Sequence, residues 1–137
     1  MADRNEFNAQ VIAEFRANGG AVGGAFEGAT IVLLTTTGAR SGLERVTPVV
    51  CRVDGDDVYV FASKAGAPTD PDWFHNLVAN PEVGVELGTD TFRARAVVLE
   101  GTTRDEVYAA HAAEYPNFAE YEAATDRVIP VVRLDRI

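Results

Sequence analysis

Short apolar, β-branched segments separated by tight turns run through most of the chain, and this pattern limits the folds open to it. Six such segments are present, at 29–36, 45–53, 58–63, 82–87, 91–99 and 128–134. The turns after the second and the fourth segment are too short for a crossover helix, so both pairs are expected to form antiparallel hairpins. Pro130 marks the last strand as an edge or a bulge.

Apolar residues at helical spacing predict three further elements. We expect helices over 5–17, 72–79 and from 102 to about 115, the last restarted or kinked by Pro116. Asn5 and Asp72 are the predicted N-caps of the first two helices. The glycines after Ala17 match neither a Walker loop nor a dinucleotide-binding motif, so they predict a flexible connector.

The length and composition suit one packed domain. The chain has 137 residues, of which 47% are hydrophobic and 24% charged, and a chain of this size buries roughly 70% of the surface that its unfolded form exposes. Strands joined mainly by hairpins predict a mainly β fold. We expect a six-stranded antiparallel barrel with flanking helices. We divide the chain into an N-terminal helix and Gly-rich connector, 1–28, and a single domain, 29–137.

The charge is unevenly distributed along the sequence. The net charge of −9 argues against a nucleic-acid partner, because phosphate backbones are bound by clustered Lys and Arg. Residues 28–53 nevertheless carry Arg40, Arg45 and Arg52 against one acid, Glu44. This basic segment favours an anionic ligand, although arginines at strand edges that pair with acids elsewhere give the same pattern.

Cysteine usage and the first residues bear on location. Cys51 is alone, which excludes an intramolecular disulfide and suits a reducing compartment. Residues 1–7 lack the apolar centre of a secretory signal, and no apolar run approaches the ~20 residues of a membrane-spanning helix. We therefore expect a cytoplasmic protein. A peripheral contact with the inner face of the cell membrane stays open.

Few residues are suited to hydrolytic or metal chemistry. The only serines, Ser41 and Ser63, lie outside the G-x-S-x-G motif, so a hydrolase triad is not expected. His111 and Glu114 have a weak ligand spacing on the third helix and are expected to face solvent. His75 is assigned to a pocket wall or a helix face, and no metal site is predicted.

Two loops are suited to an anionic, planar ligand. The loop Thr37 to Gly42 can present backbone N–H groups, the Ser41 hydroxyl and the Arg40 guanidinium to phosphate, although its glycines also suit a tight hairpin. Lys64, the only lysine, follows the third strand. If the strand ends lie close together, the two loops converge. Trp73 is suited either to stacking on a ring or to the core.

The ordered motifs of the chain resemble those of the deazaflavin-dependent nitroreductase family. The motifs are Leu33 to Gly42, Arg45, Thr47-Pro48, Ala62 to Pro68, Trp73, Asn76-Leu77, Asn80-Pro81, Tyr115-Pro116, Phe118, Tyr121, Thr125, Arg127 and Ile129 to Val131. Members of this family resemble split β-barrel flavoproteins, use the deazaflavin coenzyme F-420, and reduce quinones and, in some cases, nitroaromatic compounds. The resemblance therefore implies an FMN-binding-protein-like split barrel that transfers a hydride from the reduced coenzyme to such an acceptor.

The resemblance also assigns roles to residues. It implies that the coenzyme is bound by Ala39, Arg40, Ser41, Arg45, Val46, Thr47, Pro48, Val49, Val50, Phe61, Ala62, Ser63, Lys64, Asp72, Trp73, Phe74, His75 and Asn76. The candidates for contact with the acceptor are Ser63, Tyr115, Phe118 and Tyr121. Relatives commonly carry tyrosine where this chain has Phe118. The missing hydroxyl weakens the expectation that nitro compounds are reduced, whereas the expectation that the coenzyme binds is not affected.

Other functions and assemblies stay open at this point. An FMN-dependent split-barrel oxidoreductase would use the same basic segment to bind the phosphate of FMN. A coenzyme or lipid carrier would bind its ligand without turnover. The first helix is expected to serve as a lid or a packing helix, because its polar face suits anionic lipid poorly. The sequence does not indicate the oligomeric state.

Overall fold

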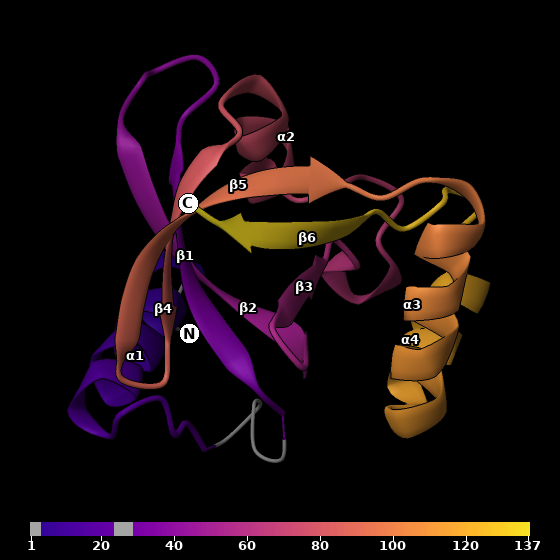
Figure 1. The fold of residues 1–137 in the computed structure, drawn as a ribbon, viewed down its shortest axis with the longest axis horizontal. Helices are drawn as coiled ribbons and strands as arrows, with labels where there is room; N and C mark the ends of the chain where they lie inside the picture. The colour runs from indigo at the N-terminus through magenta and orange to yellow at the C-terminus, as the bar shows by residue number, and fades with distance from the viewer. Residues whose placement is uncertain (1–3, 24–28) are drawn as a thin grey trace.

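The structure, a computed structural model, describes residues 4–23 and 29–137 and is built around a closed β-barrel (Figure 1). The strands are β1 (Ile31–Thr37), β2 (Glu44–Asp54), β3 (Asp57–Phe61), β4 (Glu82–Leu87), β5 (Asp90–Val98) and β6 (Val131–Arg136). Their order around the barrel is β1-β2-β3-β6-β5-β4, and every neighbouring pair is antiparallel. The six-stranded antiparallel barrel predicted from the sequence is confirmed.

Helices cover three parts of the barrel. The helices that the structure describes are α1 (Arg4–Ala17), α2 (Asp72–Ala79), α3 (Gly101–Glu114), α4 (Asn117–Ala123) and the 3-10 turn η2 (Lys64–Gly66). Figure 1 shows α1 on one side of the barrel, the pair α3 and α4 on the opposite side, and α2 beside the β1–β2 loop. The flanking helices thus leave the β1–β2 loop at one end of the molecule.

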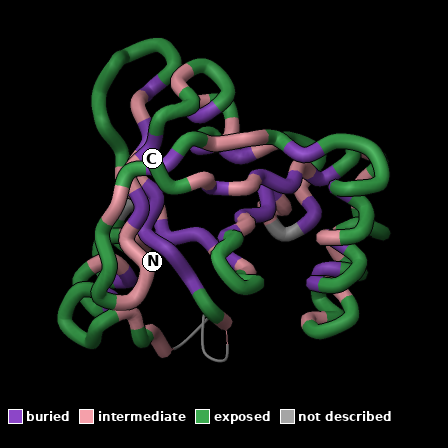
Figure 2. The backbone as a smooth tube through the Cα atoms, in the orientation of Figure 1, coloured by how far each residue is buried: buried purple, intermediate pink, exposed green. Residues whose placement is uncertain are grey.

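The barrel interior is filled by alternate residues of all six strands. A strand points successive side chains to opposite faces, and the inward set forms one buried cluster. Its members are Val32, Leu34, Val49, Cys51, Val58, Val60, Ala62, Val83, Val85, Ala94, Val132 and Leu134. Trp73 and Leu77 of α2 belong to the same cluster, so α2 adds its apolar face to the barrel core. In Figure 2 the buried backbone accordingly follows the strands.

Two smaller clusters fix the helices to the outside of the barrel. Val11 and Phe15 of α1 pack on Ile31 and Leu33 of β1. A second, larger cluster joins α3 and α4 to β3 and β6. Val50 of β2 packs against both clusters. The outer face of β2 therefore lies between α1 and the α3–α4 pair.

Several details differ from the sequence prediction. Asn5 already lies within α1, and Asp72 is the first residue of α2 rather than its cap, a position that Pro71 occupies. Strand β6 begins after Pro130 and pairs with both β3 and β5, so this proline marks neither an edge nor a bulge. Closure of the barrel gives β6 two neighbours. Part of the predicted connector, residues 24–28, lies outside the described residues.

Candidate functional site

The loop between β1 and β2 is closed by its own hydrogen bonds. The N–H groups of Gly38 and Gly42 donate to the carbonyl oxygens of Leu43 (2.8 Å) and Gly38 (3.0 Å), and Leu43 N–H donates to Ser41 Oγ at 3.2 Å. The loop is thus the hairpin turn that its glycines allowed. The backbone N–H groups of Arg40 and Ser41 have no hydrogen-bond partner among the described residues, and both residues are exposed. Their N–H groups are available to a ligand.

Helix α2 supports the same loop from the side. Asn76 Oδ1 accepts a hydrogen bond from Ala39 N–H at 3.0 Å, while its Nδ2 donates to Thr36 Oγ1 at 3.3 Å. One turn later, Asn80 Nδ2 donates to the Thr37 carbonyl oxygen at 3.4 Å. Asn76, a predicted site residue, therefore positions the loop that carries Arg40 and Ser41.

The three arginines of the basic segment differ in their surroundings. Arg52 pairs with Glu114 of α3, with Nη1 and Oε2 separated by 3.4 Å. The side chains of Arg40 and Arg45 are exposed and form no ion pair or hydrogen bond with any residue that the structure describes. The interpretation that these arginines pair with distant acids thus holds for Arg52 alone, and two cations remain available to an anion.

The segment that follows β3 is held by Arg127. This guanidinium donates to the carbonyl oxygens of Ala62 (3.0 Å), Ser63 (2.7 Å) and Ala67 (2.8 Å), and it pairs with the Asp70 carboxylate at 2.8 Å. Its side chain is 14% exposed. Because four partners surround one rigid, planar group, the backbone around Ser63 is fixed in place.

Arg127 was missed as a site residue by the sequence reasoning. Its partners lie 57 to 65 residues earlier in the chain, so no local pattern connects them. The only available signal was its place among the motifs shared with the deazaflavin-dependent family.

Lys64 has an unusual backbone conformation at the centre of this segment. Its φ of +47° lies in the left-handed region, which a side chain with a Cβ adopts at a cost. The Nζ atom donates to Thr69 Oγ1 at 3.2 Å. Gly66, at φ +80°, packs so closely on α4 that a Cβ there would lie 3.0 Å from the Tyr121 carbonyl oxygen and from Ala124 Cβ. The segment thus connects the cation to the α4 side of the barrel.

No direct hydrogen bond or ion pair joins the two cation-bearing loops within the described part of the chain, and their convergence stays a prediction. Helix α2 follows both loops in the sequence. Its Trp73 is 8% exposed and packs in the barrel core, as its helical spacing also allowed. Phe74 is half-buried, whereas Asp72 and His75 are exposed. Contact of Asp72, Phe74 and His75 with the coenzyme also stays a prediction.

The predicted residues of β2 and β3 divide between the two faces of the sheet. Val49 and Ala62 are buried in the barrel core. Val46 and Val50 pack on the outer face with the α1 cluster. Thr47 is half-buried and Pro48 is buried. Contact of the outward residues Val46 and Val50 with the coenzyme stays a prediction.

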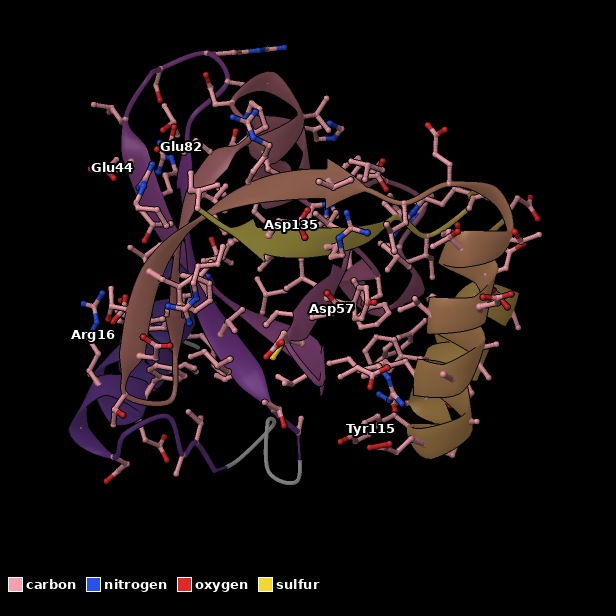
Figure 3. The ribbon with its side chains drawn as sticks, in the orientation of Figure 1. Arg16, Glu44, Asp57, Glu82, Tyr115 and Asp135 are labelled. Carbon is pink, nitrogen blue, oxygen red and sulfur yellow. The ribbon has the colours of Figure 1, made fainter. Side chains whose placement is uncertain are left out.

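Three of the predicted acceptor residues, Tyr115, Phe118 and Tyr121, belong to an aromatic cluster between β3 and the α3–α4 pair. Phe118 is 4% exposed, and its ring meets those of Phe61 (centroids 5.7 Å apart), Tyr108 (6.4 Å) and Tyr121 (5.2 Å) edge to face. Tyr115 ends α3, so the helical run is broken between Tyr115 and Phe118. Figure 3 shows Tyr115 at the end of α3, on its barrel side. The two tyrosines are half-buried, and Phe118 is enclosed.

The expectation that His111 faces solvent is wrong. Its side chain is 0% exposed because Phe61 stacks on its ring, with centroids 4.2 Å apart, and Phe118 meets it edge to face at 4.4 Å. Burial, and next the positive charge of Arg52, lower the pKa of His111 to about 4, so the imidazole is neutral near pH 7. Neither ring nitrogen has a hydrogen-bond partner in the structure.

The described residues contain neither a group of metal ligands nor a reactive thiol. Within residues 4–23 and 29–137, no three His, Cys, Asp or Glu side chains are grouped so as to hold a metal ion. Burial raises the pKa of the Cys51 thiol to about 12, which leaves it protonated. None of the described helices is both long and apolar enough to span a membrane.

Comparison with known proteins identifies the family. Residues 8–135 match the family described as F420H(2)-dependent quinone reductase. The F420H(2)-dependent quinone reductase Rv1261c of Mycobacterium tuberculosis is 35% identical over 126 residues, which covers 89% of this chain and 85% of that protein.

Two solved structures are similar to most of this chain. One, described as an F420-H2 dependent reductase (FDR-A), has a TM-score of 0.70 at 40% identity and covers 77% of this chain and 93% of its own. Another, described as a domain-swapped dimer, has a TM-score of 0.72 at 34% identity and covers 93% and 96%. Because of the match over residues 8–135 and these similarities, we conclude that the chain belongs to the F420H(2)-dependent quinone reductase family.

Proposed function

We propose that the protein is an oxidoreductase that transfers a hydride from the reduced deazaflavin coenzyme F-420 to a quinone. The observation that carries this proposal is the β1–β2 loop and the start of β2, where two backbone N–H groups of the loop and the guanidiniums of Arg40 and Arg45 have no partner among the described residues. The coenzyme has a phosphate and an oligoglutamyl tail, and such donors suit both anions. The residues of the loop thus fit the coenzyme that the family name implies.

Three side chains would hold the anionic part of the coenzyme. Arg40 provides a planar guanidinium that can bind phosphate in a bidentate manner. Ser41 can donate its hydroxyl hydrogen while its oxygen still accepts from Leu43 N–H. Lys64 adds a positive charge after β3. Asn76 and Arg127 do not need to touch the coenzyme, because their role is to position the two loops.

The remaining predicted residues would shape the reaction site. When bound, the reduced deazaflavin supplies the hydride, and the protein supplies orientation and a site from which water is excluded. Ser63, Tyr115 and Tyr121 carry hydroxyl groups that would stabilise negative charge on the acceptor. Burial and the neighbouring Glu114 raise the pKa of Tyr115, so its phenol keeps its proton.

The identity of the acceptor depends on the aromatic cluster. Phe118 provides no hydroxyl, and its ring is enclosed by other aromatic rings. We infer that quinones are the principal acceptors and that nitroaromatic compounds are reduced less well. Phe118→Tyr is expected to alter the preference among a panel of quinones and nitroimidazoles more than the affinity for the coenzyme. Unchanged relative rates across the panel would contradict this role of Phe118.

The test uses purified protein, the reduced coenzyme and menadione. Return of the oxidised deazaflavin absorbance is followed against a control without protein and a parallel trial with FMN. Faster oxidation with the deazaflavin alone supports the proposal. Binding without faster oxidation favours a carrier, and turnover with FMN alone favours an FMN-dependent oxidoreductase. Either result overturns the proposal.

Variants then test the assigned cations. Arg40→Ala and Lys64→Ala should each weaken coenzyme binding by about 1.5–3 kcal/mol, the contribution of a hydrogen bond to a charged group. Arg16→Ala is the matched control, because Arg16 is an exposed arginine that pairs with Glu86 on β4. Equal coenzyme affinity in all three variants and the wild type would remove Arg40 and Lys64 from the site.

A further inference from the structure

His111 is a buried polar group with no hydrogen-bond partner among the described residues. Its side chain is 0% exposed, and both Nδ1 and Nε2 lack a hydrogen bond in the structure. A neutral imidazole has one N–H donor and one acceptor nitrogen, and leaving either unpaired in the interior is costly. An apolar ring of the same shape would fill this space without that cost.

The surroundings of His111 are those of the proposed acceptor site. Phe61 lies flat against one face of its ring, with an interplanar angle of 14°, and Phe118 meets it at 78°. Tyr115 lies over it at 4.8 Å between centroids, tilted by 39°. Two of these three rings are buried, whereas Tyr115 is half-exposed. Of the three rings that contact the imidazole, Tyr115 is therefore the one that reaches the surface.

We propose that His111 is an acceptor-binding residue, whose neutral imidazole donates an N–H hydrogen bond to a quinone oxygen once Tyr115 has moved aside. This inference rests on the proposed function. In the reaction the quinone gains two electrons and a proton as hydride from the reduced coenzyme, and a second proton from water, to give the hydroquinone. His111 stays neutral throughout, and its hydrogen bond stabilises the negative charge that develops on the oxygen.

A first experiment observes His111 directly in the unmodified protein. The chain has only two histidines, His75 and His111, so long-range ¹H–¹⁵N spectra of the imidazoles contain two sets of signals. The set that is absent from His111→Phe belongs to His111. With the oxidised coenzyme present, so that no turnover occurs, added menadione should shift the His111 nitrogen signals. Signals that stay fixed at menadione concentrations that saturate turnover overturn the proposal.

A second experiment compares stability with turnover. His111→Phe should unfold at the same or a higher urea concentration than the wild type, bind the coenzyme with unchanged affinity, and lose about tenfold in kcat/KM for menadione, the loss expected for one hydrogen bond. His111→Gln, which keeps an N–H donor, should recover part of that loss. Ile129→Val, a conservative change in the same cluster, should instead lower stability and keep turnover.

The outcomes separate this inference from the function on which it rests. A His111→Phe protein that keeps kcat/KM within twofold, while it binds the coenzyme normally, overturns the role of His111 and leaves the reductase function intact. A wild-type protein that neither binds the coenzyme nor speeds its oxidation by menadione overturns the proposed function, and the role of His111 with it.

Discussion

Arg127 Nη2 donates to the carbonyl oxygen of Ser63 at 2.7 Å, and this bond joins the last connection of the chain to the segment after β3. The same guanidinium also binds two further carbonyl oxygens and the Asp70 carboxylate. It thus fixes the backbone next to Lys64, where the conformation is strained. The proposed coenzyme site depends on a residue that does not need to touch the coenzyme.

Arg127→Lys should therefore destabilise the protein despite keeping the charge. An ammonium group cannot reproduce a planar fork, so several of the four partners lose their donor. We expect a loss of about 2–4 kcal/mol in the free energy of unfolding, measured by urea denaturation. Arg16→Lys, at an exposed pair with Glu86, should change it by less than about 1 kcal/mol. Similar losses in both variants would show that Arg127 does not organise this segment.

Gly38→Ala should weaken coenzyme binding through Ser41. A Cβ on Gly38 would collide with Ser41 Oγ, which must then move, and the turn opens. Gly42→Ala is the matched control in the same loop, because its φ of +70° is strained for alanine but its Cβ meets nothing within 4 Å. Both variants are expected to lose some stability. In a titration with the coenzyme, the Gly38 variant should bind more weakly than the Gly42 variant, and the reverse order would contradict the role of Ser41.

Lys64 can be tested for charge and conformation separately. Lys64→Gly removes the charge but adopts φ +47° without strain, whereas Lys64→Ala removes the charge and keeps the strain. If the charge holds the coenzyme, both variants lose affinity equally, and their unfolding free energies differ by no more than about 1 kcal/mol. Near-normal coenzyme affinity in Lys64→Gly alone would show that the backbone conformation matters and the ammonium group does not.

The elements of the fold could be predicted from the sequence where local residues decide them. Helix α2 was predicted over the residues it occupies, because Pro71 and Asn80-Pro81 limit it on both sides. Closure of the barrel was less accessible to local reasoning. Pro130 suggested an edge or a bulge, but the pairing of β6 with both β3 and β5 places this proline just before the strand.

The site residues stay predictions, but the sequence made some of them easier to single out than others. The Ser41 loop and Lys64 stood out as short motifs with their own chemistry. His111 was misjudged, since the residues that bury it, Phe61 and Phe118, come from a strand and from another helix. A polar residue beside Glu114 on a helix is usually solvated, and only tertiary packing overrides that expectation.

Acidification should destabilise the protein through the same histidine. The pKa of His111 is lowered to about 4 in the folded protein, by burial and then by Arg52, against about 6.5 in an unfolded chain. Between these values the unfolded chain binds the proton more readily, so the free energy of unfolding falls as the pH drops from about 6.5 to 4. Unfolding in urea at pH 7 and at about pH 4.5 should show the wild type losing roughly 2 kcal/mol more than His111→Phe, which has no group to protonate there. Equal losses would mean that the imidazole is not held neutral in the folded state, because a histidine with an unshifted pKa contributes nothing to the pH dependence of folding.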